Sequence, residues 1–172
     1  MAKSTIDITS LNQHMGQPLG TSRWLEINQS RVTKFAEATG DFNWIHVDQE
    51  RARTELASGR TLVQNFLLLS LIPQLFDQTV AFSGLRYGQN KGARKLNFLA
   101  PLATGSRVRL RVSLAKIDQD ETGGQLVTFP LILEEDGSDC PVLNLDLRLL
   151  LVAEQRVRLR ISSADQHQAV AL

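Results

Sequence analysis

The most informative stretch of this sequence reads Phe35-Ala36-Glu37-Ala38-Thr39-Gly40-Asp41-Phe42-Asn43-Trp44-Ile45-His46-Val47-Asp48-Gln49-Glu50-Arg51-Ala52. The residues that recur at the spacing of one helical face are Val32, Phe35, Ala36 and Thr39. Gly40 predicts the end of that helix, because glycine readily takes the left-handed conformation found there. Asp41, Asn43 and His46 then project from a turn that apolar neighbours anchor. Polar groups on such a turn indicate a site.

The stretch resembles the signature of the (R)-specific enoyl-CoA hydratases, also called MaoC-like hydratases. In that signature an aromatic residue precedes Gly-Asp-X-Asn-Pro-aliphatic-His, and Ala or Ser follows after five further residues. The matching positions here are Phe35, Gly40, Asp41, Asn43, Ile45, His46 and Ala52. Trp44 replaces the proline, and the run from Trp44 to Asp48 looks most like the nodulation-protein-N-like branch of the family. The resemblance spans roughly residues 22–152.

This resemblance implies an α+β hot-dog fold, in which an antiparallel sheet wraps around a central helix and the preceding helices form a hydratase overhang. It also implies a homodimer paired through the sheets. The implied reaction is the reversible (R)-specific hydration of a trans-2-enoyl-CoA, or of an acyl-carrier thioester, to the 3-hydroxyacyl thioester. No cofactor is expected.

The resemblance also implies roles for individual residues. Asp41 would be the principal base that activates water, and His46 would orient that water and share the proton transfer. Asn43 would fix either the turn or the water. In the family a His-Gly pair at the start of the hot-dog helix supplies backbone N–H groups to the thioester oxygen. Gln64 and Asn65 align with that pair, so the expected oxyanion donor is the backbone N–H of Asn65.

Other interpretations of these residues remain open. Asp41 could cap a turn and His46 could be a core histidine, which would suit a non-catalytic hot-dog subunit that binds an acyl chain or supports a partner. A hot-dog thioesterase is a further alternative, although it would not need the signature. The basic cluster, defined as Lys91, Arg94 and Lys95, either contacts CoA phosphates or forms a solvated face.

The residues after the motif predict one buried helix followed by a sheet. Asn28 and Asp48 are placed to cap helices that lead to Gly40 and over residues 49–57. Residues 62–76 are apolar around nearly the whole circumference of a helix, which predicts a helix buried on nearly all sides. Arg107, Arg109 and Arg111 alternate with Val108, Leu110 and Val112, the pattern of a strand with one wet face.

Further strands are expected over residues 22–27, 79–87, 94–99, 125–134 and 143–149, with turns at 121–124 and 136–139 that would join antiparallel hairpins. The chain then divides into an N-terminal arm (1–20), the hot-dog domain (21–153) and a C-terminal extension (154–172). A short helical turn is expected within the arm. The extension opens with a strand-like alternation and contains His167.

Composition limits the classes of partner. The 172 residues carry 19 basic and 18 acidic side chains, so the net charge of +1 favours neither nucleic acid nor an anionic membrane as a partner. The N-terminal residues lack the apolar core of a signal peptide, and the single Cys140 fits a reducing compartment, so we expect a cytoplasmic protein. No metal site is expected, because His14, His46 and His167 show no ligand spacing.

Overall fold

A computed structural model describes residues 3–121 and 123–154. Its main sheet has seven strands in the order β2-β6-β8-β9-β5, with β3 paired to β6 and β7 paired to β8, and all its neighbouring strands are antiparallel. A smaller parallel sheet joins β1 (Ser4–Asp7) to β4 (Val80–Ser83). The strands of the main sheet are β2 (Pro18–Thr21), β3 (Leu25–Glu26), β5 (Leu85–Phe98), β6 (Arg107–Ser113), β7 (Lys116–Gln119), β8 (Gln125–Glu135) and β9 (Pro141–Ala153).

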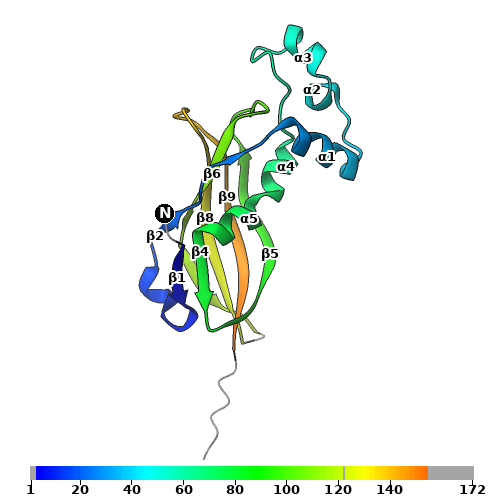
Figure 1. Ribbon diagram of the computed structural model, residues 1–172. Coiled ribbons are helices and arrows are strands. Elements are labelled where there is room, and N and C mark those ends of the chain that lie inside the picture. The colour runs from blue at the N-terminus through cyan, green and yellow to red at the C-terminus, as the bar shows by residue number, and fades with distance from the viewer. Residues whose placement is uncertain (1–2, 122, 155–172) are drawn as a thin grey trace, which may run out of the picture.

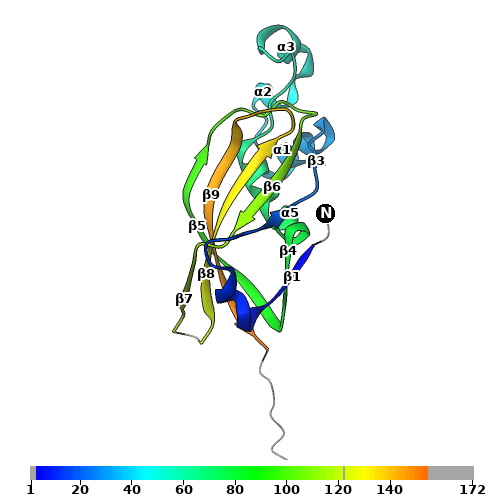
Figure 2. The same ribbon diagram turned by 90° about the vertical axis from the view of Figure 1, so that its left-hand side faces the viewer.

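The helices fall into two groups that lie in different places. Helices α1 (Gln29–Thr39), α2 (Trp44–Val47) and α3 (Gln49–Glu55) gather at one end of the sheet, with α1 alongside that end and α2 and α3 beyond it (Figures 1 and 2). We call this group the overhang. Helices α4 (Asn65–Ser70) and α5 (Ile72–Thr79) follow one another across the face of the sheet. The sheet curves around them, which confirms the predicted antiparallel sheet wrapped around a helix.

The predicted two-faced strands are confirmed. Along β6, Val108, Leu110 and Val112 are fully buried, whereas the arginines between them reach the outer face. Strand β8 lies between β6 and β9, so the three form the expected antiparallel set. At the centre of the core, the fully buried Phe129 meets Phe76 of α5 edge to face at 5.1 Å between ring centroids. This aromatic contact joins the sheet to the helix it encloses.

The central helix differs from its prediction in two respects. Residues 62–76 do not form one helix, because Leu62 and Val63 are extended and donate backbone hydrogen bonds to Ile45 and Leu102. The remaining segment divides at Leu71, with Pro73 in the first turn of α5. Burial on nearly all sides was also wrong, since Phe66 is 67% exposed. Phe66 instead faces Phe98 of β5 at 6.2 Å between ring centroids.

The other departures concern short elements. The segment 1–20, expected to be an arm, contributes Ile6, Ile8, Leu11 and Leu19 to the core, because β1 and β2 join the two sheets and a 3₁₀ helix (Ile8–His14) lies between them. The strand expected at 22–27 is limited to β3. The strands expected at 79–87 and 94–99 are instead β4 and the long β5. The alternation expected after residue 154 and His167 lie outside the described residues.

Across residues 3–121 and 123–154, no helix combines the length and the apolar character that crossing a membrane requires.

Candidate active site

The overhang is shaped by caps that the sequence encodes. Asn28 accepts a hydrogen bond from the Arg31 backbone N–H and so starts α1, which ends at Gly40 in the left-handed region with φ of 76°. Both features were predicted, and so was the cap that Asp48 provides to α3 by accepting from the Arg51 N–H at 3.0 Å. The turn between α1 and α3 therefore holds its polar side chains in fixed directions.

Asp41 and His46 lie together on this turn. The Asp41 Oδ2 atom is 3.9 Å from the His46 Nε2 atom, a separation that suits a water held between the two groups rather than a direct hydrogen bond. The side chain of His46 is only 12% exposed, whereas that of Asp41 is 45% exposed. The carboxylate is thus reached from solvent while the imidazole is fixed behind it.

A backbone carbonyl fixes the tautomer of His46. The Nδ1 atom lies 2.7 Å from the carbonyl oxygen of Leu62. Because a carbonyl can only accept, Nδ1 carries the hydrogen, and Nε2 of the neutral ring presents its lone pair on the Asp41 side. A histidine in this state can accept a proton from a water bound beside Asp41.

Asn43 lies at the N-cap of α2. Its contacts stabilise the turn and do not reach into the space between Asp41 and His46. Its Oδ1 faces the Ile45 N–H at 3.4 Å, and its backbone carbonyl accepts from the His46 N–H at 2.9 Å. Of the two roles considered from the sequence, the contacts support the structural one. Asn43 places His46 at the third position of a very short helix.

A cavity of about 500 Å³ connects these groups to the start of the central helix. Its lining includes Asp41, His46 and Asn65, so residues far apart in the sequence meet in one space. Asn65 is the first residue of α4, where backbone N–H groups have no partner within the helix. Gln64, the N-cap, is buried, and its Nε2 donates to the Val32 carbonyl of α1 at 3.1 Å. We call this space the polar cavity.

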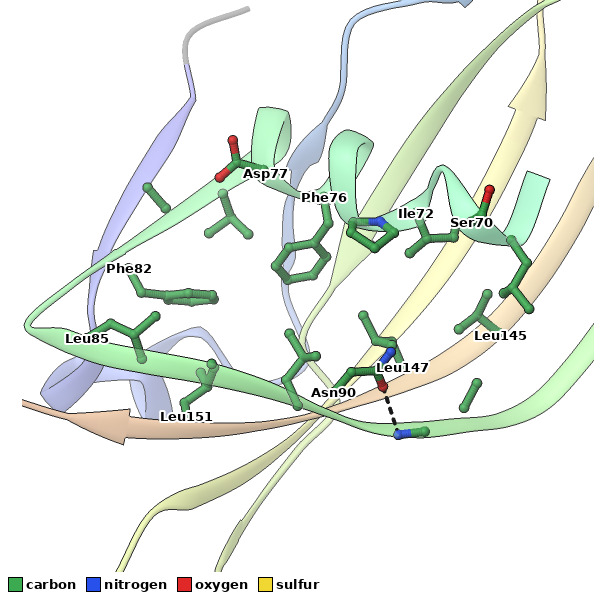
Figure 3. Close-up of a pocket in the computed structure, with 18 of the residues that line it drawn as sticks. Ser70, Ile72, Phe76, Asp77, Phe82, Leu85, Asn90, Leu145, Leu147 and Leu151 are labelled. Carbon is green, nitrogen blue, oxygen red and sulfur yellow. Dashed lines mark hydrogen bonds between the residues drawn. The ribbon is translucent and has the colours of Figure 1, made fainter. Parts of the chain in front are cut away.

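A second, larger cavity lies further along the same helices. It measures about 790 Å³ and is lined mainly by α5, β4, β5 and β9 (Figure 3). Leucine side chains of β9 form its floor, while Ile72 and Phe76 project into it from α5. On β5 it is bordered by small residues, among them Gly88 and Ala93. We call this space the apolar cavity, and no sequence pattern had pointed to it.

The basic cluster does not join either cavity. Lys91, Arg94 and Lys95 all lie on β5 and are exposed, but none of them lines the polar or the apolar cavity. Lys95 has φ of 51° and places its Nζ 3.1 Å from Asp146 of the neighbouring strand. Among the described residues β5 has one strand neighbour, β9, so its other edge is free. The cluster therefore lies beside an open sheet edge.

The part of the chain in residues 3–121 and 123–154 contains no group of three metal-ligating side chains close enough to hold a metal ion. Cys140 is a free thiol on the surface, at the turn before β9.

Sequence reasoning missed Gln29, whose side chain touches the turn that carries Asp41 and His46. Its Nε2 donates to the backbone carbonyl of His46 at 2.8 Å, and its Oε1 accepts from the buried Thr61 hydroxyl. Gln29 stands at the start of α1, directly after the predicted cap, where a polar residue is ordinary. Only the fold reveals that it reaches residues 17 and 32 positions away.

Known proteins resemble this chain over most of its length. The family model of the MaoC-like domain matches residues 10–133. The 3-hydroxyacyl-thioester dehydratase Z of Mycobacterium tuberculosis is 37% identical over 134 residues, which cover 78% of this chain and 88% of that protein. Nodulation protein N of Rhizobium leguminosarum is 32% identical over 146 residues, which cover 80% of this chain and 86% of that protein.

Solved structures share the fold. The MaoC-like dehydratase from Rhodospirillum rubrum aligns with a TM-score of 0.66 at 15% identity, covering 81% of this chain and 93% of that one. The (R)-hydratase from A. caviae involved in PHA biosynthesis aligns with a TM-score of 0.63 at 22% identity, covering 80% of this chain and 98% of that one. These alignments confirm the hot-dog fold predicted from the motif.

Proposed function

The chain belongs to the MaoC-like dehydratase family, and we propose that it catalyses the reversible (R)-specific hydration of trans-2-enoyl thioesters to 3-hydroxyacyl thioesters. The observation that carries this proposal is the polar cavity, which brings an acid, an imidazole and a helix N-terminus together. The relative from M. tuberculosis is named as a dehydratase of 3-hydroxyacyl thioesters. The same site would serve both directions of the reaction.

The geometry supports a division of labour between the two side chains. A water between Asp41 and His46 would donate hydrogen bonds to the carboxylate and to Nε2. Asp41 takes a proton from this water while the water oxygen forms a bond to C3 of the enoyl group. The electron pair of the C2–C3 double bond moves toward the thioester oxygen, and C2 then takes a proton from the Asp41–His46 pair. One water is thereby added, with no net change at the protein.

The negative charge that develops on the thioester oxygen needs a donor. We assign this role to the backbone N–H of Asn65, which lies at the positive end of α4 and borders the polar cavity. Asn65 has a side chain where the family has glycine, but the residue is exposed, so the side chain has solvent to turn into. The backbone donor is the same for either residue.

The apolar cavity fits the acyl chain of a longer substrate. Helix α4 begins beside the polar cavity at Asn65 and ends beside the apolar cavity at Ser70, a distance of about 8 Å for six residues. A chain that runs along the helix from the thioester would enter the apolar cavity, whereas a four-carbon chain would end before it. We therefore propose medium or long acyl chains as substrates.

The Ala93→Phe variant tests this assignment, because its ring would fill part of the apolar cavity without touching the polar one. We expect kcat/KM for a long enoyl-CoA to fall about tenfold, the size of the loss when a pocket no longer admits a few methylenes, while kcat/KM for crotonyl-CoA stays unchanged. Gln89→Phe, on the same strand but outside the lining, is the matched control. An equal loss for both substrates would exclude the apolar cavity as the acyl site.

We further propose a homodimer formed through the free edge of β5. An unpaired strand of 14 residues is a template for pairing with another chain.

The basic cluster on this strand would contact the phosphates of CoA. Removal of two of its charges in the double variant Lys91→Ala/Arg94→Ala should raise KM for an enoyl-CoA but not for the corresponding pantetheine thioester. The free surface thiol of Cys140 suits a reducing compartment, so we place the reaction in the cytoplasm.

A second candidate function is a non-catalytic hot-dog subunit that binds an acyl chain. The replacement of the family's His-Gly pair by Gln64 and Asn65 favours it, because the buried Gln64 is committed to the Val32 carbonyl. A wild-type protein that binds an acyl-CoA but does not hydrate an enoyl-CoA would have this second function rather than the first.

The decisive experiment follows the loss of enoyl absorbance when purified protein is added to crotonyl-CoA and to a longer enoyl-CoA. We expect turnover, and a fall of about 10²- to 10⁴-fold in kcat for Asp41→Asn, because the amide cannot accept the proton. Asp48→Asn is the control, since Asp48 is a nearby helix cap that does not line the polar cavity. A folded protein without turnover on either substrate would favour the non-catalytic subunit.

A further inference from the structure

The orientation of His46 depends on contacts at two different atoms. Its ring donates from Nδ1 to the Leu62 carbonyl, and its own backbone carbonyl accepts from Nε2 of Gln29 at 2.8 Å. In addition, the Leu62 N–H donates to the Ile45 carbonyl at 2.8 Å. The short helix α2 is therefore fastened to α1 on one side and to the strand-like segment 61–63 on the other.

The buried Thr61 hydroxyl links the two contacts of α2, because Thr61 belongs to segment 61–63 and also bonds to Gln29 of α1. The Thr61 hydroxyl lies 2.5 Å from Gln29 Oε1 and 2.8 Å from the Thr104 hydroxyl, and both threonines are buried. Because Gln29 Oε1 can only accept, the single Thr61 proton goes to Gln29, and Thr104 donates to Thr61. The Thr61 carbonyl accepts in turn from the Thr104 N–H at 2.8 Å.

The chain of bonds has a defined direction from the sheet side of the molecule to the active-site turn. Thr104 is itself held by Arg60, whose guanidinium donates to the Thr104 carbonyl at 3.1 Å. From Thr104 the hydroxyl bonds run through Thr61 to Gln29, and from Gln29 to the backbone of His46. Each buried polar group in this chain has a partner, and a fully satisfied network of this kind rigidifies its surroundings.

We propose that Gln29, together with Thr61 and Thr104, is a positioning unit that keeps the His46 ring in its Nδ1–H tautomer with Nε2 directed at the reacting water. The unit does not touch substrate. It acts by fixing both the backbone of His46 and the segment whose Leu62 carbonyl receives the ring hydrogen. This inference rests on the proposed function for its effect on rate, but its effect on the tautomer stands without it.

Two variants with matched controls test the unit by turnover. In Gln29→Leu we expect kcat to fall by about 10- to 100-fold with little change in KM, because a small displacement of a catalytic group lowers the rate without weakening substrate binding. Gln49→Leu is the control. Gln29 and Gln49 both line a further cavity of about 250 Å³, but among the described residues Gln49 is outside the Gln29–Thr61–Thr104 hydrogen-bond network. Thr104→Val should lower kcat, and Thr104→Ser, which keeps the hydroxyl, should restore it.

The ¹⁵N chemical shifts of the His46 ring give a readout that a merely structural role would not move. His46→Asn identifies the signals. The wild type should show one protonated and one unprotonated nitrogen at a pH where the ring is neutral, and Gln29→Leu should show shifts averaged toward a mixture of tautomers. Unchanged ring shifts in a folded Gln29→Leu protein would overturn the proposal, as would equal activities of Thr104→Val and Thr104→Ser.

The two proposals can fail separately. If the wild type does not hydrate any enoyl thioester, the proposed function is lost, but a tautomer change in Gln29→Leu still supports the unit. If the wild type is active and the ring shifts do not respond, the function stands and the unit is rejected.

Discussion

The sheet and the overhang are built by different forces. Along β6, β8 and β9 the inward-facing side chains are almost entirely buried, and Phe129 packs against two other aromatic rings. In the overhang, α1 buries Val32 and Ala36, but α2 has no buried residue and α3 buries Ala52 alone. Helix caps and partly buried hydrogen bonds to Gln29 and Leu62 hold α2 and its turn in place.

This difference separates stability from chemistry. Apolar burial supplies most of the free energy of folding, so the sheet should determine whether the chain folds. Hydrogen bonds contribute less but fix directions, and direction is what the Asp41–His46 pair requires. Substitutions in the sheet should therefore change stability, and substitutions in the overhang should change the rate. Each of the following predictions tests that separation.

The largest expected effect on stability is that of Phe129→Ala. The ring is fully buried and contacts Phe76 and Phe82, so its removal should lower the free energy of unfolding by about 3–5 kcal/mol. Urea denaturation measures the loss, and Thr128→Ala, on the opposite face of β8, is the control. If kcat of the remaining folded fraction also collapses, the sheet and the site are not separable.

Asn65→Pro should have the next largest effect, and it should lower the rate without changing the stability. Proline suits the first position of a helix, and Gln64 before it has the extended backbone that proline requires, so the chain should fold. The variant lacks the N–H assigned to the oxyanion, and kcat should fall by about 10²- to 10³-fold. Asn65→Ala keeps that N–H and serves as control. Equal activity of the two variants would contradict the assignment.

Local rules were sufficient to predict much of the overhang and of the sheet. The caps at Asn28 and Asp48 and the left-handed Gly40 were predicted because each depends on a few neighbouring residues. The alternation along β6 was predicted for the same reason. The family signature predicted the fold, and it also singled out Asp41 and His46 as the catalytic candidates.

What could not be predicted depends on distant parts of the chain. Nothing near Gln29 in the sequence indicates that it bonds Thr61, because the two meet only when α1 packs beside segment 61–63. Likewise the helix expected over 62–76 begins late, since the backbone of Leu62 pairs with the overhang instead. The apolar cavity lies where β5 bows outward (Figure 1), and small residues of that strand border it, an arrangement that no periodicity encodes.

The cap at Asp48 should matter moderately and only locally. Asp48→Ala removes the side-chain bond to the Arg51 N–H and should cost about 1 kcal/mol, which amounts to roughly fivefold faster hydrogen exchange of the α3 amides. Glu50→Ala, on the same helix but not at its cap, is the control. A comparable loss in the global free energy of unfolding would show that the overhang and the sheet unfold as one unit.

The smallest expected effect lies on the outer face of the sheet, at Glu134. Burial raises the pKa of this carboxyl, but hydrogen bonds from Arg111 and Arg109, together with their charges, outweigh burial and hold its pKa below the ordinary value. A lowered pKa in the folded state means that the ionised group stabilises the fold above the ordinary pKa of about 4.3. That stabilisation is lost as the pH falls through the lowered pKa.

Glu134→Gln should accordingly reduce the free energy of unfolding by about 1 kcal/mol or less near pH 7, because ion pairs on an accessible sheet face contribute little. The difference from the wild type should shrink as the pH falls below about 4. Denaturation curves at both pH values measure it, and kcat at neutral pH should not change. A rate effect would mean that the outer face communicates with the overhang, which shares no hydrogen bond with Glu134 among the described residues.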